Sequence, residues 1–449
     1  MTDRVLSRPA LAVVMAGASL VTVDISMTST ALPELSRALG VSPANAIWVV
    51  NAYYLAVIAA LLPMAALGDN IGHRRLCLIG LALFGAGSAG AGLSDGFLAV
   101  VGSRAMIGLG AAAVNASTPA LIRSLYPAHR LGRGLGLYAM IVGLSLSLGP
   151  PMTSFVIAIA DWQWLFRVTA AGAVLAYLAG RRALPVTIPS GKRVDRIAVV
   201  LCAVTFALLL FALSGIGRID IRWVALAGAG AMAFGIVLWR RDSRNPAPLL
   251  AMDLFRRPVF ALSSATSICA FVVQGLVFVV LPFLFSVEMG YTQIEAGLLI
   301  TPWPAALALM TLIAAPLSDR VAPGLLAFAG LLVLSVGVVG IATMPVDASI
   351  VGIAARLVIC AIGYGLFQSP NMVAIMQSAP LDRSGAASGV LALSRLLGQA
   401  IGAVVVAVSF LLWSEAGMHT ALWIAACVSV LGAAFSILRL LPRLRHPEG

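Results

Sequence analysis

Apolar runs of roughly 18 to 28 residues recur along the whole chain, and they limit its possible folds more than any other feature. About 20 helical residues are enough to cross the hydrocarbon core of a bilayer. Strands of a membrane barrel would alternate in polarity, whereas these runs are continuously apolar and indicate helices. We therefore predict a polytopic membrane protein of about fourteen spans, at residues 9–32, 46–67, 76–93, 97–122, 134–159, 163–180, 197–216, 222–240, 258–285, 294–317, 323–344, 350–377, 385–413 and 418–440.

The basic residues are placed asymmetrically between these spans. The net charge is +12, which by itself would suggest a nucleic-acid partner. With a cytoplasmic N-terminus, however, 22 of the 29 basic residues fall in the terminal segments and the even-numbered connections. Such asymmetry is the positive-inside pattern, so we expect both termini in the cytoplasm and an even number of spans. It favours a cell-membrane protein, in the inner membrane of a bacterium, over a nucleic-acid-binding protein.

Two segments about 253 residues apart align without gaps, beginning at Pro127 and at Pro380. In this alignment, Pro127, Arg130, Gly132, Gly136 and Gly149 meet Pro380, Arg383, Gly385, Gly389 and Gly402. At offsets of 250 to 252, Asp69 meets Asp319, Arg104 meets Arg356 and Asp24 meets Gln274. The repetition predicts two six-helix bundles in parallel repeat, at 1–182 and 258–449, separated by two inserted helices in 183–257. Parallel repeats with the substrate path between them are a recurrent transporter architecture.

Short motifs in a fixed order give the chain a family resemblance over nearly its whole length. They are VDISMTSTALP from Val23, WVVNAYYLA from Trp48, LGDNIGHRR from Leu67, RAMIGLG from Arg104 and GPPMTS from Gly149. The pattern resembles the fourteen-helix drug:proton antiporters of the major facilitator superfamily. It departs from that family at Ser29, Ala65, Asn70, His73, Ile107, Thr153 and Ser154. The resemblance implies proton-coupled multidrug efflux, with the acid of the first helix engaging a proton or a cationic drug.

Asp24 is the one acidic residue that lies deep within a predicted span. A charge at the centre of a membrane helix costs about 2.5–3.5 kcal/mol on insertion scales, so Asp24 must face protein or water. Asp24 lies roughly 13 Å below the outer end of its helix and Arg104 roughly 10 Å below the outer end of another, so the two side chains can meet. Burial disfavours the charged carboxylate and a neighbouring arginine favours it. Asp24 and Arg104 are therefore our candidates for proton coupling, and the alternative is a static ion pair that locks two helices.

The second half does not repeat this chemistry, because Gln274 replaces the acid expected opposite Arg356. Arg395 is a further intramembrane cation without an obvious partner. Polar and aromatic residues in the spans are candidates for a substrate cavity, although packing and an interfacial belt are the alternatives for any single ring. The candidate cavity residues are Ser26, Thr28, Asn51, Tyr53, Tyr54, Gln274, Phe278, Arg356 and Arg395.

Two further groups of residues suggest moving parts. Asp69, Gly72 and Arg74 lie in a short connection, where Gly72 permits a tight turn. Together with Asp319 they are candidates for a conformational latch, and an ordinary positive-inside loop is the alternative. Gly149 and Pro150 should bend the fifth predicted helix and allow it to pack closely on another span.

We expect a secondary transporter that exports hydrophobic or amphipathic cationic compounds by alternating access, coupled to protons. A proton-coupled transporter of a defined organic anion is the alternative within transport, and a membrane sensor or lipid-handling scaffold is the alternative outside it. The chain has no soluble segment long enough for an enzyme and no glycine-rich phosphate loop. The five cysteines, Cys77, Cys202, Cys269, Cys360 and Cys427, are isolated in apolar spans and lack the spacing of metal ligands. We expect a monomer that acts on a small molecule and protons within the bilayer, with no cofactor and no metal.

Overall fold

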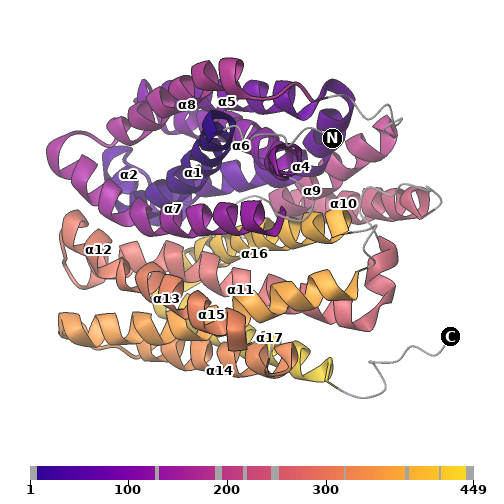
Figure 1. Cartoon of the computed structure of the whole chain (residues 1–449). Coiled ribbons are helices and arrows are strands. Elements are labelled where there is room, and N and C mark those ends of the chain that lie inside the picture. The colour runs from indigo at the N-terminus through magenta and orange to yellow at the C-terminus, as the bar shows by residue number, and fades with distance from the viewer. Residues whose placement is uncertain are drawn as a thin grey trace. The chain divides into compact units, whose positions relative to one another are not determined.

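A computed structural model of the chain describes residues 8–126, 131–187, 195–215, 220–243, 252–317, 320–379, 384–413 and 416–440. All regular secondary structure in these segments is helical (Figure 1). The elements of the first half are α1 (Arg8–Thr30), α2 (Leu32–Ala38), α3 (Pro43–Ala46), α4 (Trp48–Ile71), α5 (His73–Gly92), α6 (Phe97–Leu125), α7 (Leu131–Ile159), α8 (Gln163–Ala183), α9 (Arg196–Gly215) and α10 (Ile221–Asp242). They are followed by η2 (Met252–Arg256), α11 (Pro258–Phe283), the π-helical η3 (Leu284–Glu288), α12 (Gln293–Ile300), α13 (Pro302–Leu317), α14 (Pro323–Ala342), α15 (Ile350–Ser378), α16 (Ser384–Trp413) and α17 (Gly417–Leu438).

Each of the fourteen predicted spans is helical, which confirms an all-helical polytopic membrane protein. Within the described residues, 12 helical segments are long and apolar enough to cross a membrane. The two predicted spans outside that set are α8, which carries Arg167, Arg181 and Arg182, and α9, whose apolar part Ile197–Ala212 is shorter. Because of these two helices, the total of fourteen spans stays a prediction.

The chain divides into two compact units, one of Met1–Phe211 with Ala227–Gly235 and the other of Ala212–Leu226 with Ile236–Gly449. In the first unit, α1 packs against α7 and α8, α5 packs against α6 and α8, and α4 packs against α6. In the second unit, α11 packs against α16 and α17, α14 packs against α15 and α17, and α13 packs against α15. The same neighbours therefore recur in the same chain order, as expected for a repeated bundle.

Glycines bring the most closely packed helices together in both units. A Cβ atom added at Gly80 of α5 would collide with the backbone of α6 at Gly110, and one added at Gly330 of α14 would collide with α15 at Gly363. Small residues at such contacts let two helix backbones approach closely in a membrane, where lipid provides no hydrophobic drive for association. Gly110 and Gly363 therefore mark equivalent positions of α6 and α15.

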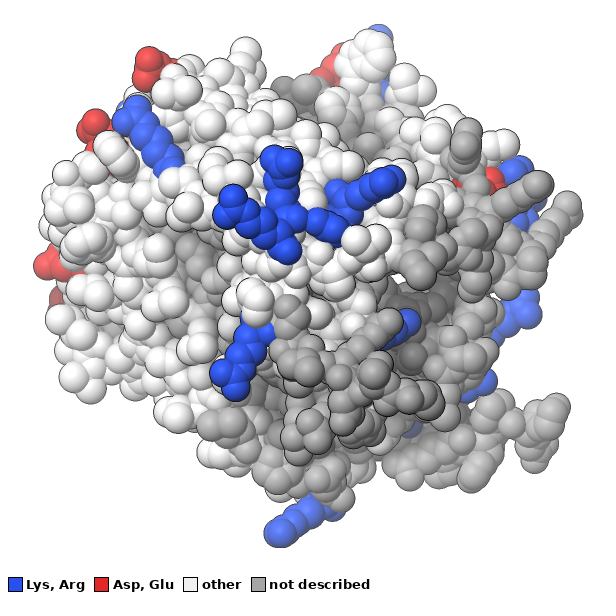
Figure 2. All heavy atoms as spheres, turned by 45° about the horizontal axis from the view of Figure 1, so that its top comes forward, with Lys and Arg blue, Asp and Glu red and all other residues white. Residues whose placement is uncertain are grey.

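The outer surface of these helices is rich in exposed apolar side chains. Leu98, Leu175, Val336 and Val351 are among the large apolar side chains that are more than half exposed. In Figure 2 a broad white area on the left carries few charged side chains, whereas Lys and Arg side chains gather near the centre of the view. An apolar outer surface is what a bundle surrounded by lipid requires, since hydrocarbon cannot solvate charged groups.

Candidate functional site

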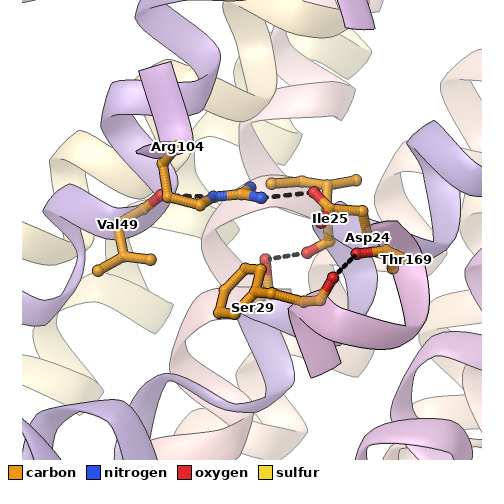
Figure 3. A network of polar contacts seen from close by, with 7 residues as sticks. Asp24, Ile25, Ser29, Val49, Arg104 and Thr169 are labelled. Atoms are coloured by element: carbon orange, nitrogen blue, oxygen red, sulfur yellow. Dashed lines mark hydrogen bonds and ion pairs between the residues drawn. The ribbon is translucent and has the colours of Figure 1, made fainter. Parts of the chain in front are cut away.

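The centre of the first unit holds an ion pair between Asp24 on α1 and Arg104 on α6. Arg104 Nη1 donates to Asp24 Oδ2 at 2.5 Å, and the two side chains are 0% and 1% exposed, respectively. Figure 3 shows the guanidinium lying between the carboxylate on one side and α4 on the other. The pairing predicted from the depths of these residues is therefore present.

Arg104 is held on its other side by α4. Its Nε donates to the Val49 carbonyl at 3.0 Å (Figure 3). Its guanidinium carbon lies 4.7 Å from the ring centroid of Tyr53 and 5.9 Å from that of Phe166 on α8. Aromatic faces attract cations, more strongly when both groups are desolvated. The arginine thus connects α1, α4, α6 and α8 through a single charged group.

Several buried polar atoms of this unit lack hydrogen-bond partners within the described part of the chain. Among them are Nη2 of Arg104 and both atoms of the side-chain amide of Asn51 on α4, a residue that is 3% exposed. Buried polar groups without partners are uncommon in native structures and often belong to functional sites or to water sites. Tyr54 is also buried, and its ring packs edge-on against Tyr53 with 5.5 Å between the centroids.

The hydroxyls that follow Asp24 along α1 are mostly satisfied by protein groups. Ser29 donates to the Ile25 carbonyl at 2.8 Å, and Ser26 donates to the Leu146 carbonyl of α7 at 3.0 Å. Thr28 is buried on the same helix. The Ser26 bond joins α1 to α7, whereas the Ser29 bond returns to a carbonyl of its own helix and satisfies the hydroxyl there.

The predicted helix 5 motif forms the contact between α7 and α1. Gly149, Pro150 and Pro151 lie within α7, and a Cβ atom added at Gly149 would overlap the Ser26 side chain. Thr153 Oγ1 donates to the Met27 carbonyl of α1 at 3.1 Å. The motif therefore packs against α1 within three residues of Asp24.

The turn between α4 and α5 contains the predicted latch residues. Gly72 has φ of 90°, a conformation that favours glycine, and it ends α4 and begins α5. His73 Nε2 lies 3.2 Å from Asp69 Oδ1. Arg74 donates through its backbone N–H to Thr187 Oγ1 at 3.0 Å and through Nη2 to the Arg181 carbonyl at 2.6 Å. These bonds hold the turn to the end of α8, whereas Asp319 lies outside the described residues.

In the second unit, Gln274 of α11 faces polar partners other than Arg356. Gln274 Oε1 accepts from Tyr364 Oη and from Gln399 Nε2, each at 3.2 Å. Phe278 packs against Trp303 with 5.4 Å between the ring centroids, and Trp303 lies 6.5 Å from Tyr364. The predicted Phe278 therefore borders an aromatic cluster in which Trp303 and Tyr364 are buried, and the sequence did not single out Tyr364 or Gln399.

The predicted equivalence of Arg104 and Arg356 is wrong by one residue. Gly110 and Gly363 pack alike, and so do Ile107 against Gly87 and Cys360 against Gly337, so α6 and α15 correspond at an offset of 253. Arg356 therefore takes the position of Ser103, and one residue turns a side chain by about 100° around a helix.

Accordingly, Arg356 points toward α14 and not toward Gln274. Its Nε donates to the Gly340 carbonyl at 2.8 Å and its Nη1 to the Gly352 carbonyl at 2.9 Å. Arg395 of α16 is half-buried, and no hydrogen-bond or ion-pair partner is found for it in the described segments. Of Arg104, Arg356 and Arg395, Arg104 alone is paired with a carboxylate in the part of the chain that the structure describes.

Comparison with known proteins identifies the family. Residues 14–403 match the Major Facilitator Superfamily. The chain is 38% identical over 443 residues to the uncharacterized transporter YebQ of Escherichia coli (strain K12), covering 97% of this chain and 96% of that protein. It is 28% identical over 410 residues to the multidrug resistance protein Stp of Mycobacterium tuberculosis (strain CDC 1551 / Oshkosh), covering 90% of this chain and 76% of that protein.

The fold is also that of a solved transporter. A crystal structure of a POT family transporter in complex with 5-aminolevulinic acid superposes with a TM-score of 0.74 at 17% identity, over 97% of this chain and 96% of that one. These relatives are transporters and not enzymes. The chain therefore belongs to the Major Facilitator Superfamily and is a multi-pass membrane transporter.

Proposed function

We propose that this chain is a proton-coupled secondary transporter that exports hydrophobic or amphipathic cations, with Asp24 as the coupling acid. The observation that carries the proposal is the buried pair of Asp24 and Arg104. A proton or a cationic substrate that engages the carboxylate competes directly with Arg104 for the same oxygen atoms. The multidrug resistance protein Stp, at 28% identity, supports the substrate class.

Release of Asp24 from Arg104 would leave the guanidinium attached to α4 and α8. The bond to the Val49 carbonyl and the faces of Tyr53 and Phe166 do not depend on the carboxylate. α1 would then be free to shift relative to α4 and α6. Because Gly149 of α7 packs on α1 next to Asp24, a shift of α1 is transmitted to α7. Such a movement is the local change that alternating access needs.

The turn around Gly72 is proposed as a latch at the other end of these helices. Arg74 fixes it to the end of α8, and Asp69 pairs with His73 across the turn. These contacts would have to break and reform if α4 and α5 change their positions relative to α8. We place this turn and both chain termini on the cytoplasmic side, following the distribution of basic residues. The described helices are compatible with fourteen spans.

Three intramembrane arginines, Arg104, Arg356 and Arg395, would favour the alternative of a transporter for an organic anion. Arg104 is neutralised by Asp24, and Arg356 is bonded to helix carbonyls. Arg395 is the one of these three for which no partner is found among the described residues. A single half-buried cation is a weaker basis for anion transport than three.

The test is transport by the purified protein in liposomes, with a pH gradient imposed in each direction and a panel of cationic dyes and organic anions. We expect gradient-driven movement of cations with the wild type and its loss in Asp24→Asn. The matched control is Glu34→Gln, because Glu34 pairs with Arg37 on the short helix α2 at the surface. Cation movement that survives in Asp24→Asn would reject Asp24 as the coupling acid. Movement of anions alone would replace the proposal with the organic-anion alternative, and no flux of any probe would favour a sensor or scaffold.

A further inference from the structure

One end of the second unit contains a cavity of about 540 Å³ that the proposed transport chemistry does not use. Two helices begin at it, α11 at Pro258 and α14 at Pro323, and two helices end at it, α15 at Ser378 and α17 at Leu438. Its lining includes Arg257, Pro258, Pro323, Gly324, Ser378 and Arg439, and none of the lining residues is acidic. Among the described residues that line the cavity, two arginines are positively charged and none is negatively charged.

The two helix starts add to the positive potential. The first N–H groups of a helix have no partner within the helix, and the N-terminus carries about half a positive charge. α11 and α14 have 26 and 20 residues, long enough for a full helix dipole, and both start with proline. Neither start has a side-chain cap. Backbone N–H groups at such positions are suited to contact an anion.

Arg439 contributes a buried charge that no carboxylate neutralises in the part of the chain that the structure describes. The residue is 4% exposed, and its guanidinium remains cationic at neutral pH, as arginine does in proteins. Its Nη1 donates to Asn371 Oδ1 at 2.6 Å and to Ser263 Oγ at 2.7 Å. Its Nη2 donates to Ser436 Oγ at 2.8 Å and to the Pro323 carbonyl at 3.3 Å. Nε donates to the Ser436 carbonyl at 3.2 Å.

These bonds use all five N–H groups of Arg439, and every acceptor is neutral. The guanidinium is therefore fixed among α11, α14, α15 and α17, and its charge extends into the cavity. A charge held in this way stabilises an anion through its field, without a direct hydrogen bond. Without an anion, burial of this cation is costly, because neutral acceptors compensate only part of the lost hydration.

Arg257 lines the cavity with a guanidinium that has free N–H groups in the described part of the chain. Its side chain is exposed, and Nη1 donates to the Ser378 carbonyl at 3.0 Å, which positions the guanidinium at the cavity. This bond leaves Nε and Nη2 available for a ligand. Arginine forks match the geometry of phosphate oxygens and form two parallel, charge-assisted hydrogen bonds with them.

We propose that this cavity is a binding site for a phosphate group, held by Arg257 and the first turns of α11 and α14 in the field of Arg439. The site lies where membrane helices start and end, at the depth of lipid headgroups, so a phospholipid is one source of the phosphate and a soluble phosphate compound is the other. It is separate from Asp24 and Arg104, which belong to the first unit, and it does not depend on the proposed coupling mechanism.

The test compares two neighbouring arginines in the purified full chain in detergent. Arg257→Gln removes the contact residue, and Arg256→Gln is the matched control because Arg256 is exposed but does not line the cavity. Inorganic phosphate and short-chain phosphatidylglycerol are titrated separately at constant ionic strength, and binding is obtained from the concentration dependence of the unfolding midpoint. We expect saturable stabilisation of the wild type, about tenfold weaker apparent affinity in Arg257→Gln, and a change of less than about twofold in Arg256→Gln.

The two probes distinguish the sources of the phosphate. An Arg257-dependent effect of both probes supports a site that needs the phosphate group alone. An effect of phosphatidylglycerol alone assigns a lipid headgroup, and an effect of inorganic phosphate alone assigns a soluble ligand. Equal losses in Arg257→Gln and Arg256→Gln would overturn the proposal, and so would the absence of stabilisation by either probe.

Discussion

Removing one partner of the Asp24–Arg104 pair should destabilise the first unit far more than removing both. Asp24→Asn leaves Arg104 as an uncompensated charge at 0% exposure, with one bond to Val49 and one close aromatic face. Breaking a buried pair in this way costs about 3–5 kcal/mol, whereas replacing both charges is often nearly neutral. We therefore expect Asp24→Asn and Arg104→Met each to lower the free energy of unfolding by at least about 3 kcal/mol, and the double variant to lower it by less than either single variant.

A buried thiol reports this effect locally. Cys77 on α5 is 2% exposed, so in a variant that keeps only this cysteine its labelling follows opening of the first unit. When opening is fast relative to labelling, 3 kcal/mol corresponds to about a hundredfold faster labelling. A parallel variant that keeps only Cys360, buried in the second unit, is the control and should label at an unchanged rate. Strict additivity of the two single variants, or changes below about threefold, would refute the ion-pair argument.

Other variants test contacts around the pair. Gly149→Ala should impair transport because the added Cβ atom overlaps the Ser26 side chain, and adding Ser26→Gly should restore much of the transport in the same flux assay. Gly143→Ala is the control and should have little effect, because a Cβ atom there has no neighbour within 4 Å. Failure of Ser26→Gly to rescue would show that the contact is unimportant. Gly72→Ala should lower the free energy of unfolding by about 1–2 kcal/mol or more, because alanine is strained at the φ of 90°. The measurement is the unfolding midpoint, and an unchanged midpoint would contradict the need for glycine. Arg356→Gln should lower the free energy of unfolding by about 1–3 kcal/mol and keep gradient-driven transport within about twofold of the wild type. Loss of coupling at normal stability would argue that this arginine is part of the coupling site.

The helices could be predicted closely because the signal is local. Length and apolar composition alone determine whether a segment can span a bilayer. The span predicted at 350–377, for example, corresponds to α15 at Ile350–Ser378. The uncertain spans are those in which local signals conflict, such as α8 with its three arginines. The partner of Asp24 was also predictable, since a buried charge needs compensation and the helical rise fixes depth. The contacts of Arg104 with the Val49 carbonyl and the Tyr53 ring could not be predicted, because the rotation of α4 about its axis depends on tertiary packing.

Repetition in the sequence predicted the duplicated bundle but misplaced Arg356. Aligned apolar residues do not fix a helix register, and a one-residue slip still matches arginine with arginine. The glycine contacts of α5 with α6 and of α14 with α15 fix the register in three dimensions. Arg439 shows a second limit, because an arginine at the end of a span looks like any other cytoplasmic charge. The polar residues Ser263, Asn371 and Ser436 in otherwise apolar helices were the signal that could have identified its buried position.

Proton movement driven by substrate is the most direct measurement of coupling at Asp24. In liposomes without an imposed pH gradient, a gradient of a transported cation should change the internal pH with the wild type and with Glu34→Gln. Asp24→Asn, reconstituted in folded form, should move no protons above the level of empty liposomes, because the carboxylate that would carry the proton is absent. Proton movement in Asp24→Asn equal to that of the wild type would contradict the assignment of Asp24 as the coupling acid.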